Sequence, residues 1–533
     1  MTKFKNLASV FIIGFLLSTL LLVPSFADYF TQSKWFGFYL FSALAAIYLV
    51  FQAQLQTLPH AATKIFIGIG FLWLLSLIKN FSSVNTLLIL RITASFFVIL
   101  FYREFFKLKN WFGTFLFSAG LAGGLHLIFQ DWFFLQHQNV DYFFGHENMS
   151  AELNGFFILI CVFCFLRTIK TWHKWILLLL AFNSFACIVR QNTRSVYLAL
   201  ILAVGYLFIF NLSDRMRRKI KWPFMALGLI AFLVIILPNL NVNSSSAFSH
   251  LKFFTNEGKA QSAQNRLARW LNTLVLIKEN PLGTGFQSYE FSYLPYRNAV
   301  KNEIEVREIF LSLSPHNSFL DAAAEHGILL AFSLFALFGW LIIQTSRSSN
   351  QTAESRALTS TWIYLLGLGL TAFPFELAWS YNLSLLCLTY FFVTLFGSRN
   401  FLVTRFYRVV IIFGTGVLIF LIAGFSFSLY AEKNFVDEIE FNNLSCQLFP
   451  SQWRVCLNEV KIALEKKQDH LADLKAQAVL QRQPLNYIAL GLRAQALDRL
   501  GHKDEACAVM HSYTGIWGEN HSLRNFQAEV CRP

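Results

Sequence analysis

Charged residues are scarce in this chain. They make up 14% of its 533 residues, whereas a soluble globular domain has about 25%. Hydrophobic residues account for 55%, and phenylalanine alone occurs 60 times. Apolar runs of about 20 residues, long enough to cross a bilayer as helices, recur from Ala8 to Tyr430. The composition therefore excludes an ordinary soluble protein and predicts an all-α membrane protein.

Motifs of several common enzyme classes are also missing. The sequence has no Asp-x-Asp pair for a divalent cation, no His-Glu-x-x-His motif and no Walker-type phosphate loop. Gly283-x-Gly285 follows an expected helix rather than a strand, which indicates a turn and not a dinucleotide site. The net charge of +14 does not point to nucleic acid, because membrane proteins concentrate lysine and arginine in cytoplasmic loops. We expect no metal and no cofactor.

The apolar runs predict a polytopic helical bundle of about 12–13 spans. The candidate segments are 7–24, 35–52, 64–80, 84–101, 111–129, 150–166, 175–192, 195–211, 223–239, 318–343, 357–376, 378–396 and 409–430. Lys3 and Lys5, the first apolar run and Ser25-Phe26-Ala27 are together typical of a signal peptide. Because further spans follow at once, we expect this first run to remain as an uncleaved span.

Lysine and arginine are distributed unevenly between alternate loops. Loops on the side of the N-terminus carry basic clusters such as Arg215, Arg217 and Arg218, whereas residues 130–149 contain no lysine or arginine. Basic loops are usually cytoplasmic, so we expect a cytoplasmic N-terminus and an exported C-terminus in a bacterial inner membrane. The expected parts are an N-terminal transmembrane bundle (1–239), a large periplasmic loop (240–317), a C-terminal transmembrane bundle (318–430) and a periplasmic helical domain (431–533).

The periplasmic loop is expected to contain an amphipathic helix that ends at Asn280-Pro281. Its apolar face follows the helical spacing i, i+3, i+4 and i+7 and consists of Leu267, Trp270, Leu271, Leu274 and Val275. We expect this helix to lie on or near the membrane.

The polar tail is expected to form four helices, Gln452–Lys467, Leu471–Gln481, Leu485–Leu500 and Lys503–Tyr513. One pair resembles a tetratricopeptide-like unit, although a small helical domain is the simpler prediction, since such repeats need stacked neighbours. The tail contains four cysteines, and Cys446–Cys456 with Cys507–Cys531 is one of three possible disulfide pairings. Two disulfides would fit an oxidising periplasm.

Four arginines stand out at the expected exported face. Arg190 and Arg194 flank the boundary between two spans, and Arg266 and Arg269 are three residues apart on the amphipathic helix. Snorkelling toward lipid headgroups is the simpler explanation for such residues. A guanidinium also suits a diphosphate, because it stays charged and donates paired hydrogen bonds.

His316 is the candidate general base. It lies in Pro315-His316-Asn317-Ser318-Phe319-Leu320, where a polar segment gives way to an apolar run. Imidazole titrates near neutral pH and can accept a proton there, although a histidine in a loop usually has no catalytic role. Other residues that could position a substrate are Asn317, Glu325, Glu147 and Asn148.

Three sequence blocks resemble the bacterial O-antigen ligase and polymerase superfamily. They are Thr193-Arg194-Ser195, Arg266…Trp270…Asn280-Pro281-Leu282-Gly283-x-Gly285, and His316-Asn317-Ser318-Phe319-Leu320…Glu325-x-Gly327. The resemblance implies a metal-independent, inverting transferase that takes a glycan from undecaprenyl diphosphate. It also implies that His316 deprotonates the acceptor hydroxyl, while Arg194 and Arg266, helped by Arg190 or Arg269, bind the diphosphate. Members commonly have about twelve spans, so a thirteenth span and the cysteine-bearing tail depart from the family outline.

Three acceptors remain open: lipid A–core oligosaccharide, another lipid-linked glycan, or a hydroxyl of an exported protein such as a pilin. The tail could hold a protein partner, which favours the third acceptor somewhat, but an O-antigen ligase-type reaction is our main prediction. A transporter of lipid-linked glycans would require ionisable residues near the centres of several spans. Here they gather at one edge. A membrane scaffold acting through the tail would leave the His316 block unexplained.

Overall fold

The computed structural model describes residues 2–21, 31–51, 86–136, 147–167, 171–191, 193–211, 257–286, 288–296, 299, 314–347, 352–372, 374–396, 405–434, 446, 453–482, 486–517 and 531. Every regular element within these ranges is a helix. The all-α prediction is therefore confirmed for the described part of the chain.

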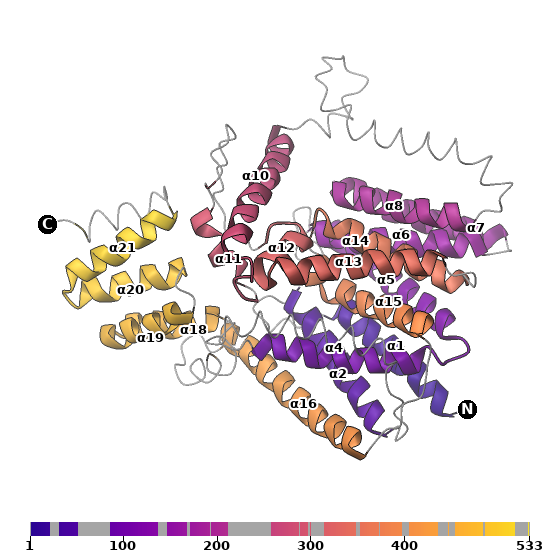
Figure 1. The fold of residues 1–533 in the computed structure, drawn as a ribbon, viewed down its shortest axis with the longest axis horizontal. Helices are drawn as coiled ribbons and strands as arrows, with labels where there is room; N and C mark the ends of the chain where they lie inside the picture. Colours follow the sequence, from indigo (N-terminus) through magenta and orange to yellow (C-terminus); the bar gives the residue numbers. More distant parts are fainter. Residues whose placement is uncertain are drawn as a thin grey trace, which may run out of the picture.

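Eleven helices of the described chain overlap expected spans (Figure 1). They are α1 (Thr2–Leu20), α2 (Thr31–Phe51), α4 (Thr86–Phe105), α5 (Trp111–Gln136), α6 (Glu147–Arg167), α7 (Thr171–Gln191), α8 (Arg194–Asn211), α13 (Ile328–Arg347), α14 (Ala353–Gly369), α15 (Ala378–Phe396) and α16 (Arg405–Asn434). The expected spans 64–80 and 223–239 lie outside the described residues. Six of the eleven contain a stretch long and apolar enough to cross a membrane. The chain is a multi-pass membrane protein.

Aromatic side chains fill the centre of the bundle and also cover its outside. Phe11, Phe41 and Tyr102 from α1, α2 and α4 are fully buried against one another. By contrast, Phe182 on α7 and Phe332 on α13 are 70% and 69% exposed. Apolar surface of this kind is stable when it faces lipid, so α7 and α13 present lipid-facing sides.

The single span expected over 318–343 is wrong. The structure has a short helix α12 (Ser318–His326) followed by the separate helix α13. Gly327 separates them with a φ of 95°, which ends α12 and redirects the chain. The next expected span, 357–376, also ends earlier than predicted. Helix α14 stops at Gly369, and a turn at 370–372 leads to the 3₁₀ helix η5 (Pro374–Glu376).

A small helical platform connects α12 to the preceding loop. It consists of α10 (Glu257–Glu279), α11 (Tyr289–Ser292), η4 (Leu294–Tyr296) and α12. Helix α10 ends immediately before Asn280-Pro281, as predicted. It packs through one side, where Leu276 and Ile277 are buried, while Leu267 and Leu274 on the predicted membrane face are 49% and 50% exposed. That apolar face is therefore free to meet lipid.

Four helices form the C-terminal domain, α18 (Trp453–Glu465), α19 (Asp469–Arg482), α20 (Tyr487–Arg499) and α21 (Lys503–Trp517), each packed against the next. Helix α21 contacts η4, and in the view of Figure 1 the domain lies to the left of the platform. The marked N-terminus lies at the other side of the molecule in this view. The tail and the platform thus share one end of the protein. Whether the four helices are tetratricopeptide repeats stays a prediction.

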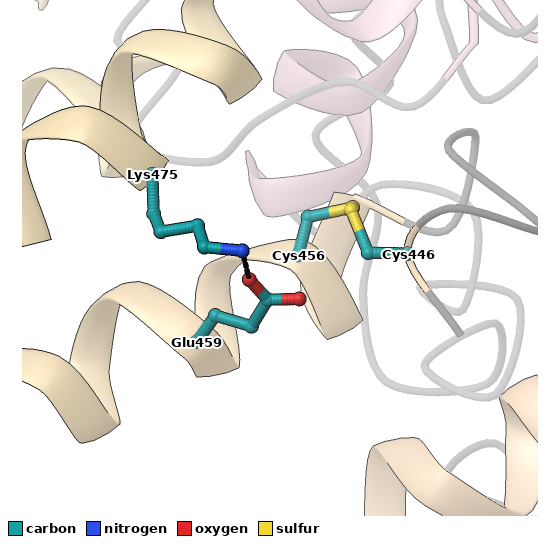
Figure 2. The surroundings of a disulfide bond; sticks show 4 residues. All are labelled: Cys446, Cys456, Glu459 and Lys475. Atoms are coloured by element: carbon teal, nitrogen blue, oxygen red, sulfur yellow. Dashed lines mark ion pairs between the residues drawn. A yellow bond between two sulfur atoms is a disulfide. The ribbon is translucent and has the colours of Figure 1, made fainter. Parts of the chain in front are cut away.

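Covalent and ionic links hold this domain together. Of the three cysteine pairings left open by the sequence, the structure has Cys446–Cys456 and Cys507–Cys531. The first lies beside an ion pair between Lys475 Nζ and the buried Glu459, whose atoms are 2.6 Å apart (Figure 2).

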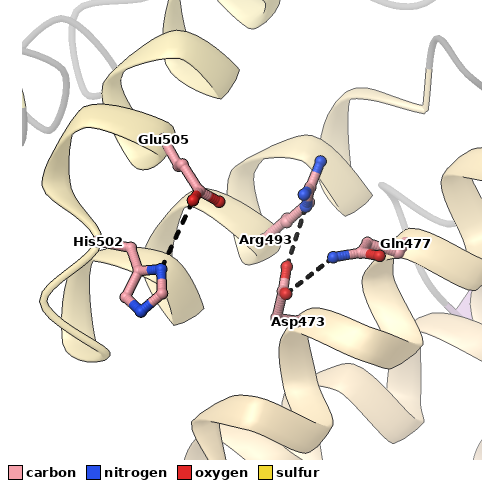
Figure 3. Close-up of polar contacts among 5 residues, drawn as sticks. All are labelled: Asp473, Gln477, Arg493, His502 and Glu505. Atoms are coloured by element: carbon pink, nitrogen blue, oxygen red, sulfur yellow. Dashed lines mark hydrogen bonds and ion pairs between the residues drawn. The ribbon is translucent and has the colours of Figure 1, made fainter.

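A second polar cluster links the later helices of the domain. Asp473 accepts hydrogen bonds from Arg493 Nε at 2.9 Å and Gln477 Nε2 at 2.8 Å, which joins α19 to α20 (Figure 3). The same view shows His502 paired with Glu505 at the start of α21, with 3.6 Å between the two atoms.

Candidate active site

The Asn280–Gly285 loop and the end of α12 fold as one unit. The backbone N–H of Thr284 donates to the carbonyl of Ala324, and that of Gly285 donates to the carbonyl of Glu325, both at 2.9 Å. The hydroxyl of Thr284 adds a third bond to Ala324 O at 3.1 Å. The last carbonyls of α12, which have no partner within the helix, are therefore capped by a loop some 40 residues earlier.

Two glycines allow this close backbone crossing. Gly283 has a φ of 86°, and a Cβ there would lie 2.3 Å from the carbonyl oxygen of Glu325. Gly327 has a φ of 95°, and its Cβ would lie 2.8 Å from the carbonyl carbon of Leu282. Only glycine fits both the left-handed backbone and the space. The Gly-x-Gly sequence is thus part of a structural joint, as the turn interpretation predicted.

Glu325 faces the platform from the last turn of α12. Its side chain is buried, and Oε1 accepts the backbone N–H of Tyr289 on α11 at 3.3 Å. The hydroxyl of Tyr289 in turn lies 2.7 Å from Thr273 Oγ1 on α10. Glu325 therefore connects α12 to α11, and this contact accounts for a carboxylate at that position.

His316 has an unusual backbone conformation for a residue with a side chain. Its φ is 53°, in the left-handed region, which histidine adopts more readily than most residues but at some cost. Its backbone N–H donates to Ser314 Oγ at 3.2 Å. On the preceding residue, the carbonyl of Pro315 accepts from Trp270 Nε1 of α10 at 2.8 Å. Helix α10 therefore fixes the segment that carries the imidazole.

Asn317 caps α12 and anchors it to the bundle. Its Oδ1 accepts the backbone N–H groups of Phe319 and Leu320 at 3.0 and 3.1 Å, the pattern of a helix N-cap. Its Nδ2 donates to the carbonyl of Leu370 at 2.9 Å. One amide group thus starts the helix and ties it to the turn after α14.

The turn after α14 binds both the segment that contains His316 and the predicted arginine Arg266. Ser318 Oγ donates to the carbonyl of Ala372 at 3.3 Å, and Arg266 Nη1 donates to the carbonyl of Thr371 at 3.3 Å. Together with Asn317, three side chains from two segments bind three consecutive carbonyls. The structure therefore brings Arg266 and the His316 block to the same three-residue turn. Their roles in a reaction stay predictions.

The other predicted residues are placed less fully. Arg269 lies on the next turn of α10 and is half-buried. Arg190 is in the last turn of α7 and Arg194 is the first residue of α8. Glu147 and Asn148 open α6. For the last four, the side chains lie outside the described part of the structure, so their roles stay predictions.

His326 is a second histidine near the platform, but its environment differs from that of His316. Its ring stacks on Phe286, with centroids 5.8 Å apart. Burial, reinforced by the positive charge of Arg91, lowers the pKa of His326 to about 4. It is therefore neutral at neutral pH and too weak a base to activate a hydroxyl there. Arg91 was not among the predicted site residues, because it lies in the otherwise apolar stretch of the expected span 84–101.

The match to a known family covers the platform. Residues 175–336 match the family model described as O-antigen ligase. This segment is similar to the O-antigen ligase family. It runs from α7 into α13 and includes His316, Asn317, Glu325 and all four predicted arginines. The turn at 370–372 lies beyond it. No curated protein gives a significant match to the chain.

Proposed function

We propose that this O-antigen ligase-like membrane glycosyltransferase moves a glycan from undecaprenyl diphosphate to an acceptor hydroxyl at the periplasmic face of the bacterial inner membrane. The family match supports the class of enzyme. The observation that carries the mechanism is the shared turn at 370–372, which holds both Arg266 and the segment of His316.

In the proposed reaction, His316 accepts the proton of the acceptor hydroxyl. The hydroxyl oxygen then attacks the anomeric carbon from the side opposite the diphosphate, and the bond between that carbon and the diphosphate oxygen breaks. The glycan ends on the acceptor with inverted configuration, undecaprenyl diphosphate leaves, and the proton remains on the imidazole. General-base assistance of this kind typically contributes 10²–10⁴-fold to the rate.

Arg266 and Arg194 would bind the diphosphate and stabilise the charge that develops on it as the bond breaks. Arg190 or Arg269 would share this role. Arg266 already donates one N–H to Thr371 O, and a guanidinium has five N–H donors, so it can bind a phosphate oxygen while it stays anchored. The bond to Thr371 O holds Arg266 at a fixed position, whereas a surface arginine without such an anchor would move freely.

The strained backbone of His316 supports a functional role. Residues at unfavourable φ values persist where their surroundings enforce them, and such residues gather at active sites. Here Trp270 holds Pro315, the residue before His316, and the carbonyl of Leu370 holds Asn317, the residue after it. The imidazole is thereby presented in a fixed direction next to the end of the bundle.

The acceptor is proposed to be lipid A–core oligosaccharide, with a second lipid-linked glycan or an exported protein as the alternatives. The C-terminal domain lies beside the platform, and α21 contacts η4, so this domain is suited to hold part of an acceptor. The cytoplasmic N-terminus and periplasmic tail belong to the same proposal.

Purified protein in nanodiscs, given glycosylated undecaprenyl diphosphate and each acceptor in turn, would test the proposal. We expect transfer to one acceptor and a loss of 10²-fold or more in His316→Ala. His502→Ala, which removes an exposed histidine of the C-terminal domain, is the matched control and should transfer normally. Undiminished transfer by His316→Ala would contradict the mechanism. Transfer to no acceptor would favour a transporter of lipid-linked glycans.

A further inference from the structure

Arg91 is a charged side chain in the membrane bundle that the proposed mechanism does not use. It is the sixth residue of α4, so it lies about 8 Å along the helix from the first residue. A charge inside a membrane helix is costly and marks a functional site unless a partner explains it. Arg91 is only half-buried, so part of the residue stays accessible.

Aromatic rings, and not acids, surround this arginine. Its Cζ lies 4.0 Å from the ring centroid of Trp35 on α2 and 5.0 Å from that of Phe286. No described carboxylate pairs with Arg91, and its Nε is buried without a hydrogen-bond partner. Cation–π contacts offset part of the cost of burying the charge, but they leave the Nε donor unused.

Phe286 connects Arg91 to the platform. It follows Gly285 directly, and its ring stacks on His326 at the end of α12. His316 precedes the other end of α12, and a helix from Ser318 to His326 is about 12 Å long. Arg91 therefore lies next to the same platform, but at the opposite end of α12 from the turn that holds Arg266.

Building on the glycan transfer proposed above, we propose that Arg91 binds a phosphate group carried by a lipid substrate, at a position separate from the diphosphate site of Arg266 and Arg194. A guanidinium held against two aromatic rings provides directed hydrogen bonds to a phosphate. A separation of about 12 Å along α12 would place this phosphate toward the lipid end of a substrate whose sugar reaches His316. The phosphate belongs to a lipid acceptor, because the only phosphates of the donor are those of the diphosphate itself.

Two variants separate phosphate binding from packing. Arg91→Met keeps a long apolar stem that packs well against aromatic rings but removes the charge, whereas Arg91→Lys keeps a charge without the planar fork. KM would be measured separately for glycosylated undecaprenyl diphosphate and for lipid A–core in phosphatidylcholine nanodiscs. We expect Arg91→Met to raise the KM for lipid A–core tenfold or more, with a smaller rise in Arg91→Lys, little change in kcat and an unchanged KM for glycosylated undecaprenyl diphosphate. Unchanged KM values for both substrates in Arg91→Met would overturn the proposal.

A binding experiment that does not depend on transfer would identify the source of the phosphate. His316→Ala protein would be treated with phenylglyoxal, with and without each lipid, and modification of Arg91 would be mapped by peptide mass spectrometry. Arg103, which is also on α4 but only 2% exposed, is the internal reference and should stay unmodified. We expect Arg91 to react and to be protected by one substrate.

Protection by lipid A–core would support the site and favour a lipid over a protein acceptor. Protection by glycosylated undecaprenyl diphosphate would overturn a separate site, because the donor carries no phosphate besides its diphosphate. Equal protection by phosphatidylglycerol, protection by neither substrate, or an Arg91 that never reacts would each overturn the site. If His316→Ala remained active, the proposed base would be wrong. The phenylglyoxal experiment would still show whether Arg91 binds the lipid, because it does not depend on transfer.

Discussion

Asn317 has two separable roles, and substitutions can remove one without the other. Its Oδ1 caps α12, and its Nδ2 ties α12 to Leu370. Asn317→Ser keeps a good capping oxygen on a side chain too short to reach Leu370. Asn317→Ala removes both contacts. We expect both variants to lose activity by a similar factor, because both release the segment that holds His316, and only the alanine variant to lose the cap as well.

The magnitudes follow from the individual contacts. Losing an N-cap costs about 1 kcal/mol, and losing the hydrogen bond to Leu370 costs about another 1 kcal/mol. Asn317→Ser should therefore be destabilised by about 1 kcal/mol and Asn317→Ala by about 2 kcal/mol. Catalysis is more sensitive to position, since a displacement of about 1 Å can cost on the order of 10²-fold in rate. We expect kcat to fall roughly 10- to 100-fold in both variants, with KM nearly unchanged.

The assay combines glycan transfer with thermal unfolding of the purified variants. Asn486 caps α20 through the N–H of Ala489, far along the chain in the C-terminal domain. Asn486→Ala is therefore a matched control, expected to lower the melting temperature without lowering kcat. A normal kcat in Asn317→Ser would show that the bond to Leu370 does not position the base, and the argument from the shared turn would fail.

Three further predictions concern single residues of the platform. His316→Asn should keep the melting temperature, because asparagine tolerates a positive φ, and should lose 10²-fold or more of the transfer rate. Gly327→Ala should lower the melting temperature and reduce the free energy of unfolding by about 1–3 kcal/mol, because the added Cβ would contact Leu282. The control is Gly339→Ala, where nothing lies within 4 Å of the added Cβ, and this variant should be as stable as the parent or more stable. His326 has a folded pKa of about 4, below the ordinary 6.5 or so, so it binds fewer protons folded than unfolded. Its contribution to stability is full above about pH 6.5 and is lost toward pH 4; His326→Gln should flatten the melting-temperature profile over this range, and an unchanged profile would contradict the assignment.

The sequence predicted the helices well because hydrophobic runs and helix ends are local signals. Helix α10 stops at Glu279, just before the Asn280-Pro281 pair that was expected to end it. The break at Gly327 was missed, because residues 318–343 were interpreted as one span in spite of the polar residues Asp321, Glu325 and His326. What bends the chain there is the packing of Gly327 on Leu282, 45 residues earlier, and no local pattern contains that contact.

The candidate site was also predictable only where the signal is local. A histidine next to a helix cap and an arginine on an amphipathic helix could be named from residue types and spacing. Their common anchor could not, because Thr371 and Leu370 contribute only backbone carbonyls, and a carbonyl has no signature in the sequence. Arg91 was overlooked for a related reason, since its two ring partners come from distant segments.

The position of the turn at 370–372 has a consequence for biosynthesis. A ribosome delivers Arg266 and His316 to the membrane well before it delivers Leu370 and Thr371, to which these segments are bound. A nascent chain that ends near residue 336, where the matched domain ends, would possess the base and the arginines without the carbonyls that orient them. The proposed active site would then be complete only after α14 and the turn that follows it have been inserted. Shorter chains would not transfer a glycan.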